Sequence, residues 1–142
     1  MIMTLAIAIS SFAAFAREGN VSTTVLDAFT TEFAEAKDVQ WTSGSNFYKA
    51  DFIMNSQYMA AYYNFNGQLL GVTRNISSLD LPLNLQNNLR KDYGSHWISG
   101  LFEVSNDDGT HYYITMENAD EVVTLKSSNN GKWKVYKKAV KS

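Results

Sequence analysis

The sequence has no cysteine, one proline and two histidines among its 142 residues. Without cysteine the chain forms neither a disulfide scaffold nor a thiolate metal site. The two histidines, His96 and His111, lie in different segments and lack the i, i+4 spacing of a helical metal-binding pair. We therefore expect no bound metal.

Sequence motifs typical of enzymes are also missing. No serine lies in a G-x-S-x-G elbow, and no glycine-rich loop has the spacing that cradles a phosphate ahead of a helix. Neither histidine is flanked by residues that resemble a catalytic triad. Glu103, Glu117 and Glu121 could meet after folding, but nothing in their spacing requires it. We therefore expect a protein that is not an enzyme and that uses no cofactor.

A strong charge of either sign is absent as well. The net charge is -2, and charged residues make up 18% of the chain. This balance predicts neither a nucleic-acid-binding surface nor a patch for anionic membranes. Apolar residues make up 45%, which predicts a folded globular chain of one domain or two small modules.

The first sixteen residues carry no charge and end in Ala14-Phe15-Ala16. This is the small-x-small pattern that signal peptidase accepts, and the apolar run is short for a membrane span. A positive charge before Leu5 is missing, and a buried N-terminal helix is the alternative. We expect residues 1–16 to be a signal peptide. Residues 17–142 would then form a periplasmic or secreted domain that is not inserted in the membrane.

A weak internal repeat runs through the rest of the chain. The offset that places Tyr48 on Tyr112 also places one Asn-Gly pair, Asn66-Gly67, on another, Asn130-Gly131. Upstream, a slightly smaller offset sets Phe29 against Leu89 and Phe33 against Tyr93. A longer loop before Tyr112 accounts for the difference. The two repeats cover about residues 22–75 and 80–140.

Each repeat begins with a helical pattern. In the first, Ser22 or Thr23 can cap a helix whose apolar residues recur at helical spacing: Val25, Leu26, Phe29, Phe33 and Ala36. In the second, Asp80 can cap, Pro82 suits the first turn, and Gly94 is a natural stop. One face of this second helix carries Leu81, Leu85, Leu89 and Tyr93.

Alternating apolar residues separated by turn signals predict four strands after each helix. Their expected ranges are 39–43, 46–54, 57–65, 68–74, 96–104, 110–117, 121–127 and 132–139. Connections this short force antiparallel pairing. The expected fold class is α+β, with two tandem helix-plus-antiparallel-meander units and the helices packed on one face of the sheet.

With these elements placed, the chain resembles the PepSY-like, β-lactamase-inhibitor-protein-like (BLIP-like) family of exported bacterial domains. The residues that carry the resemblance are Phe29, Phe33, Val39–Trp41, Tyr48, Phe52, the NFNG at Asn64–Gly67, Leu81-Pro82, the later YYITM and the NNGKW. The second copy departs from the pattern, because Gly100 stands near the place of an expected strand tryptophan. The resemblance implies a small non-enzymatic module, with no catalytic residues to carry over. It implies no particular target.

The aromatic residues of the strands are the main functional signal. Met59, Ala61, Tyr63 and Phe65 form one wholly apolar face, which we expect beneath the first helix. The opposite face offers Tyr58 and Tyr62 beside Lys49, and in the second repeat Tyr113 beside Lys126. Tyrosine is enriched at interfaces because its ring buries area while its hydroxyl stays hydrogen-bonded. We expect these five residues to bind a protein or peptide of the cell envelope.

Three alternatives stay open at this stage. The outward tyrosines could pack on each other or on the other repeat, since such pairs stabilise a sheet by about 0.2–1 kcal/mol each. The chain could instead carry a small molecule between a helix and the sheet. The five lysines from Lys132 to Lys141 could grip an acidic partner, but we expect them to protect an exposed sheet edge.

The acidic segment Asn106-Asp107-Asp108-Gly109 allows two interpretations as well. Clustered carboxylates suit calcium, but the segment lacks the acidic alternation and the distal glutamate of an EF-hand loop. Asparagine, aspartate and glycine are also the residues of tight hairpin turns. We expect a turn.

Overall fold

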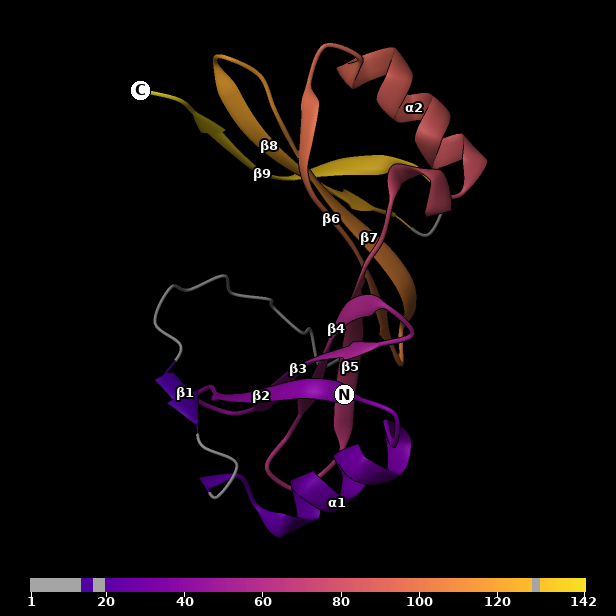
Figure 1. Ribbon diagram of the computed structural model, residues 1–142. Coiled ribbons are helices and arrows are strands. Elements are labelled where there is room, and N and C mark those ends of the chain that lie inside the picture. The colour runs from indigo at the N-terminus through magenta and orange to yellow at the C-terminus, as the bar shows by residue number, and fades with distance from the viewer. Residues whose placement is uncertain (1–13, 17–19, 129–130) are drawn as a thin grey trace. The chain divides into compact units, whose positions relative to one another are not determined.

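The computed structural model describes residues 14–16, 20–128 and 131–142. The chain is an α+β protein that divides into two compact units, Met1–Val72 and Thr73–Ser142. Each unit contains a helix and antiparallel strands (Figure 1). Within the described residues, no helix has the length and apolar character needed to cross a membrane.

In the first unit the strands follow one another in chain order. Its elements are β1 (Ala14–Ala16), α1 (Thr23–Glu32), β2 (Lys37–Ser43), β3 (Tyr48–Met54), β4 (Gln57–Tyr63) and β5 (Leu69–Asn75), which extends past the boundary between the units. β1 pairs antiparallel with β2, β2 with β3, and β3 with β4. The sequence did not predict β1, because its residues were assigned to the signal peptide. The first thirteen residues of that expected peptide lie outside the described residues.

The second unit has the same order of elements. After a short 3-10 helix, η2 (Ser78–Asp80), come α2 (Leu83–Tyr93), β6 (Trp97–Asn106), β7 (Gly109–Glu117), β8 (Glu121–Ser127) and β9 (Trp133–Val140). β6 to β9 pair as consecutive antiparallel neighbours. The eight strands expected from the sequence are all present, with bounds within two residues of the expected ones.

Residues next to the two helices determine where each helix begins or ends. The Ser22 side chain accepts a hydrogen bond from the backbone N–H of Val25, so Ser22 is the N-cap of α1. This helix ends at Phe33, before the predicted Ala36, because Phe33 leaves helical geometry with φ -125 and ψ 54. Gly94 follows the last residue of α2, as expected.

The prediction that Asp80 caps the second helix is wrong. Asp80 belongs to η2, where its carboxylate accepts a hydrogen bond from the backbone N–H of Ser77 and completes a capping box. The N-cap of α2 is Pro82, whose side chain cannot form a capping hydrogen bond. The acidic residue therefore stabilises the short helix that precedes α2.

Tight turns join the strands at the positions that the sequence indicated. Asn55 and Ser56 both have positive φ, 52° and 63°, in the two-residue turn between β3 and β4. Asp108 donates its backbone N–H to the Asn106 side chain, and Gly109 follows with φ 110°. The turn interpretation of this acidic segment is therefore confirmed.

A buried cluster in each unit joins the helix to the strands. The first cluster is Val21, Val25, Phe29, Trp41, Ala50, Phe52, Ala61 and Tyr63, and the second is Leu81, Leu85, Leu89, Leu101, Ile114, Met116, Val123 and Leu125. In the first, the Phe29 ring lies 5.2 Å from the rings of both Trp41 and Phe52, edge-on to each. Phe65, expected beneath the helix, is instead 49% exposed and packs on Tyr48, because it lies beyond the end of β4.

Candidate functional site

Each unit presents a second strand face, opposite its buried cluster. Successive strand residues point to opposite faces, and residues paired across strands share a face. Trp41, Ala50 and Ala61 are paired across β2, β3 and β4 and belong to the cluster. The adjacent row of Thr42, Lys49 and Tyr62 therefore points away from the cluster. We call this side the outer face of each unit.

The outer face of the first unit contains Lys49, Tyr58 and Tyr62, as predicted. Lys49 pairs with Tyr62 in register, and its ammonium lies 5.9 Å from the centre of the Tyr62 ring. The same ammonium forms an ion pair with Asp51 at 3.2 Å. Tyr58 is 67% exposed, whereas Tyr62 is half-buried and packs on the ring of Phe47. This face therefore carries an exposed ring and, four residues further along β4, a supported one.

The Tyr62 hydroxyl is held in its neutral form. Burial raises the pKa of Tyr62 above its usual 10.0, and the Lys49 charge offsets part of the increase. A neutral hydroxyl next to Lys49 and Asp51 can both donate and accept a hydrogen bond.

The outer face of the second unit contains Tyr113 and Lys126, which pair in register as expected. The Lys126 ammonium lies 5.5 Å from the centre of the Tyr113 ring. Tyr113, however, is 8% exposed, so the expectation of a partly exposed ring is wrong for this residue. Phe102 stacks on it with ring centres 5.3 Å apart, and Tyr136 packs edge-on at 5.4 Å. Tyr113 supports its neighbours rather than presenting its own ring.

Trp97, which was not predicted as a site residue, is 53% exposed. Trp97 is paired with Glu117, and the Lys141 ammonium lies 4.7 Å from the centre of its ring. A register shift between Ile98 and Gly100 places Trp97 on the outer face, where simple alternation from Leu101 would place it on the other side. A β-bulge leaves no clear signal in this sequence, so the alternation could not reveal it.

Glu117 and Lys141 form an ion pair beside Trp97. Their ion pair is 3.1 Å long. Hydrogen bonds from Ser99 and Lys141 lower the pKa of Glu117, so it is charged at neutral pH. This carboxylate is thus neutralised by its own neighbour.

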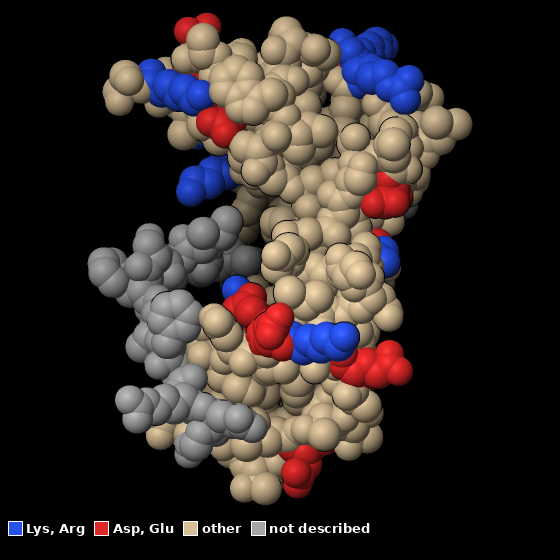
Figure 2. Space-filling model, in the orientation of Figure 1, with Lys and Arg blue, Asp and Glu red and all other residues tan. Residues whose placement is uncertain are grey.

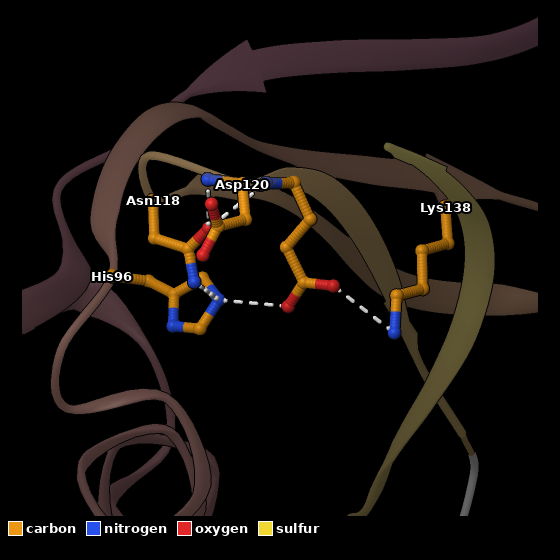
Figure 3. A network of polar contacts seen from close by, with 5 residues as sticks. His96, Asn118, Asp120 and Lys138 are labelled. Atoms are coloured by element: carbon orange, nitrogen blue, oxygen red, sulfur yellow. Dashed lines mark hydrogen bonds and ion pairs between the residues drawn. The ribbon is translucent and has the colours of Figure 1, made fainter. Parts of the chain in front are cut away.

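A polar network lies where α2 meets the turn between β7 and β8 (Figure 3). The Nε2 of His96 is 3.1 Å from a Glu121 carboxylate oxygen and 3.2 Å from the Asn118 amide nitrogen. Lys138 pairs with the other Glu121 oxygen at 3.0 Å. The Asn118 side-chain oxygen accepts from the backbone N–H groups of Asp120 and Glu121. The network ties the end of a helix to a strand turn, which is a structural role.

The histidines do not form a metal site within the described part of the chain. No group of three His, Asp or Glu side chains that could hold an ion occurs there. Most of the molecular face shown in Figure 2 is formed by uncharged residues, with charged side chains standing in small separate groups. The outer faces, with their rings and lysines, are therefore the candidate functional surfaces.

Comparison with known proteins finds solved structures with a similar fold. A BLIP-like protein from Bacteroides fragilis superposes with a TM-score of 0.73 at 18% identity, over 85% of this chain and 88% of that one. The chain has a BLIP-like fold. A DUF2874 family protein from Bacteroides ovatus is also similar, with a TM-score of 0.72 at 20% identity, over 83% of this chain and 86% of that one. No family model matches the sequence, and neither does any curated protein.

A third solved structure with this BLIP-like fold is a candidate periplasmic protein from Bacteroides eggerthii. It has a TM-score of 0.76 at 13% identity, over 84% of this chain and 88% of that one. At such identities the likeness establishes the BLIP-like fold and not an activity. In β6 of the second unit, Leu101 rather than Gly100 belongs to the buried cluster.

Proposed function

We propose that the chain is an exported, non-enzymatic module that recognises another protein through its outer faces. The apolar N-terminal sequence with its Ala-x-Ala end supports export, as does the naming of a similar solved structure as a candidate periplasmic protein. A BLIP-like fold is a scaffold of strands and two helices, so its function depends on the side chains that those strands present.

The observation that carries this proposal is the exposure of Tyr58 on the same outer face as the supported ring of Tyr62. Tyr58 is 67% exposed although it stands in a β-strand whose other face is buried. Tyr62 and Lys49, on the same face, are held by contacts with Phe47 and Asp51. Pre-positioned aromatic anchors of this kind dominate protein interfaces, at about 2 kcal/mol or more each when truncated.

We also infer that the two units are tandem copies of one helix-plus-meander motif, each with its helix on one face of its strands. Seven of the eight members of the first buried cluster have a counterpart in the second. At one constant offset, Val21, Val25, Phe29 and Trp41 correspond in order to Leu81, Leu85, Leu89 and Leu101. At the slightly larger offset that follows the longer loop, Ala50, Phe52 and Ala61 correspond to Ile114, Met116 and Leu125.

The irregularities of the strands support the same inference. The register shifts between Lys37 and Gln40 in β2, and between Ile98 and Gly100 in β6, which is the equivalent place. β-Bulges are conserved among related structures. Two bulges at matching positions therefore favour a common motif in the two units. The outer faces are related too, because the Lys49–Tyr62 pair corresponds to Tyr113–Lys126 with the two residue types exchanged.

The alternative function, a carrier of a small molecule between helix and strands, has less support. That space in the first unit is filled by rings in contact, since Phe33 lies 5.4 Å from Phe29 and 5.0 Å from Phe52. In the second unit Leu85, Leu89 and Ile114 are each at most 6% exposed. A freshly purified sample whose native mass includes a retained ligand would favour the carrier.

Site-specific crosslinking tests the proposed function. A photoreactive phenylalanine at Tyr58 should capture a discrete protein from an envelope extract of the source organism, and capture should saturate as the extract is increased. The matched control is Leu83, which is 68% exposed on α2 and should capture nothing specific. Equal capture from both positions, or none from Tyr58, would contradict the proposal.

A further inference from the structure

We propose that the outer face of the second unit is a docking surface in its own right, and that the protein surface it binds is acidic. This inference rests on the proposed function and adds the chemistry of the partner. The docking surface, here called the basic outer face, consists of Trp97, Tyr136, Lys126, Lys134, Lys137 and Lys141.

Lysines dominate the outward strand positions of this unit. Lys126 pairs with Lys134, and Lys137 pairs with Thr124, so these three lysines share the side of Tyr113. Lys141 joins them over the ring of Trp97. Among the described residues of β6 to β9, Glu117 is the one acidic residue at an outward position. Three aspartates lie in the turns between these strands, at positions 107, 108 and 120.

A bulge in β9 creates this concentration of charge. The register shifts between Thr124 and Leu125 on β8, where Val135 and Lys137 are the partners and Tyr136 is the extra residue. Without the bulge, alternation would place Lys137 on the buried side and Lys138 outward. With it, Lys137 joins the outer face and Lys138 reaches Glu121 on the other side. The strand thus separates a structural lysine from the outward ones.

The outward cations are available to a partner. Lys141 is satisfied by Glu117 at 3.1 Å, but Lys134 and Lys137 are exposed and form no ion pair among the described residues. Trp97 and Tyr136, which are 53% and 48% exposed, supply apolar area between these charges. Lysine on an edge strand is often protective, yet protection does not require two exposed rings beside the lysines.

The Tyr136 ring is held in place by a buried neighbour. Tyr113 is 8% exposed and touches Phe102, Tyr136 and the Lys126 ammonium. Ordering Tyr136 and Lys126 in the free protein reduces the side-chain entropy that binding would otherwise cost. Aromatic anchors surrounded by cations match a protein surface on which carboxylates surround an apolar residue.

Two other occupants fit the charge less well. A second copy docking by the same face would bring lysines against lysines, which is unfavourable. A dense polyanion such as a nucleic acid would also meet a chain whose net charge is -2 and whose Glu117 stands on the docking face. A protein surface with a few local carboxylates brings no lysines against these lysines. It also feels little of the chain's overall negative charge, because salt screens charges beyond about 10 Å.

Selection from a displayed library of random peptides tests the chemistry. The full chain is immobilised, and the sequences of the peptides that it retains are compared with the unselected library. We expect enrichment of aspartate and glutamate together with at least one apolar residue. We also expect at least about a tenfold loss of affinity for these peptides in Lys134→Glu/Lys137→Glu. The matched control Lys91→Glu/Lys132→Glu changes the net charge equally, at exposed positions outside the basic outer face, and should bind as the wild type does.

Each other outcome is decisive. Enriched peptides that are neutral or basic, or acidic peptides that bind Lys134→Glu/Lys137→Glu unchanged, would overturn this inference and leave the proposed function standing. No enrichment at all would count against both. Tight binding of single-stranded DNA or a sulfated polysaccharide through Lys134 and Lys137, without acidic peptides, would assign the face to a polyanion instead. Thermal unfolding of both variants shows whether they remain folded.

Discussion

Replacing Tyr63 by phenylalanine should stabilise the protein. Tyr63 is fully buried in the first cluster, and its hydroxyl has no hydrogen-bond partner among the described residues. A buried polar group without a partner costs about 1–3 kcal/mol. Phenylalanine keeps the ring in place and removes that cost, and the vacated space is one oxygen atom. We expect the free energy of unfolding to rise by about 1 kcal/mol.

Thermal and chemical unfolding measure this change directly. For a chain of this length, 1 kcal/mol corresponds to about 3–5 °C in Tm. Tyr48→Phe is the matched control, because the Tyr48 hydroxyl donates to the Asn20 carbonyl at 3.4 Å. The control should be as stable as the wild type or slightly less stable. A Tyr63→Phe variant that is less stable than the wild type by about 1 kcal/mol would mean that the hydroxyl is bonded, and would refute the reasoning.

The same substitution has a signature at high pH. Burial raises the pKa of Tyr63 well above its usual 10.0. A group whose folded pKa is raised contributes stability below the unfolded pKa and loses it as the pH rises beyond that value. The advantage of Tyr63→Phe should therefore increase above pH 10. Tyr62 and Tyr112, whose pKa values are also raised by burial, remain in both proteins and give a common background.

Two further predictions concern the buried clusters and the polar network. Phe29→Ala should lower the free energy of unfolding by about 3–5 kcal/mol and Leu89→Ala by about 2–5 kcal/mol, because each truncates a buried side chain of its cluster. A loss below about 1 kcal/mol in chemical unfolding would contradict the packing. Glu121→Gln should be less stable than the wild type at neutral pH, because Lys138 and His96 lower the pKa of Glu121. That stability is lost as the pH falls below about 4.5 through the lowered pKa, so the two acid-unfolding curves should converge there, and parallel curves would exclude the contribution.

Much of the architecture could be predicted from local patterns. Helical and alternating spacing indicated both helices and eight strands, because most of these elements bury one face and have polar or small residues at their ends. Asn55-Ser56 and Asp108-Gly109 marked their turns through side chains that tolerate positive φ. The N-terminal end of the second helix was misassigned, because an acidic residue before Pro82 suits either of two short helices equally well.

The candidate site was predicted less completely than the fold. Lys49, Tyr58 and Tyr62 lie on one outer face because alternation is unbroken in β3 and β4. The outward positions of Trp97 and Lys137 were not anticipated, because the bulges in β6 and β9 reverse the alternation beyond them. The burial of Tyr113 depends on Phe102 and Tyr136, which come from other strands. Long-range neighbours of this kind leave no mark in the local sequence.

The most direct test of protein recognition by the outer faces is oxidative footprinting of the chain with and without its captured partner. Hydroxyl-radical labelling reads the exposure of individual side chains, and Tyr58 and Trp97 are 67% and 53% exposed in the free protein. The account predicts that oxidation of one or both rings falls severalfold in the complex while Leu83 on α2, 68% exposed, is unchanged. Protection of Leu83 with both rings still oxidised would place the partner on the helical side and contradict the account.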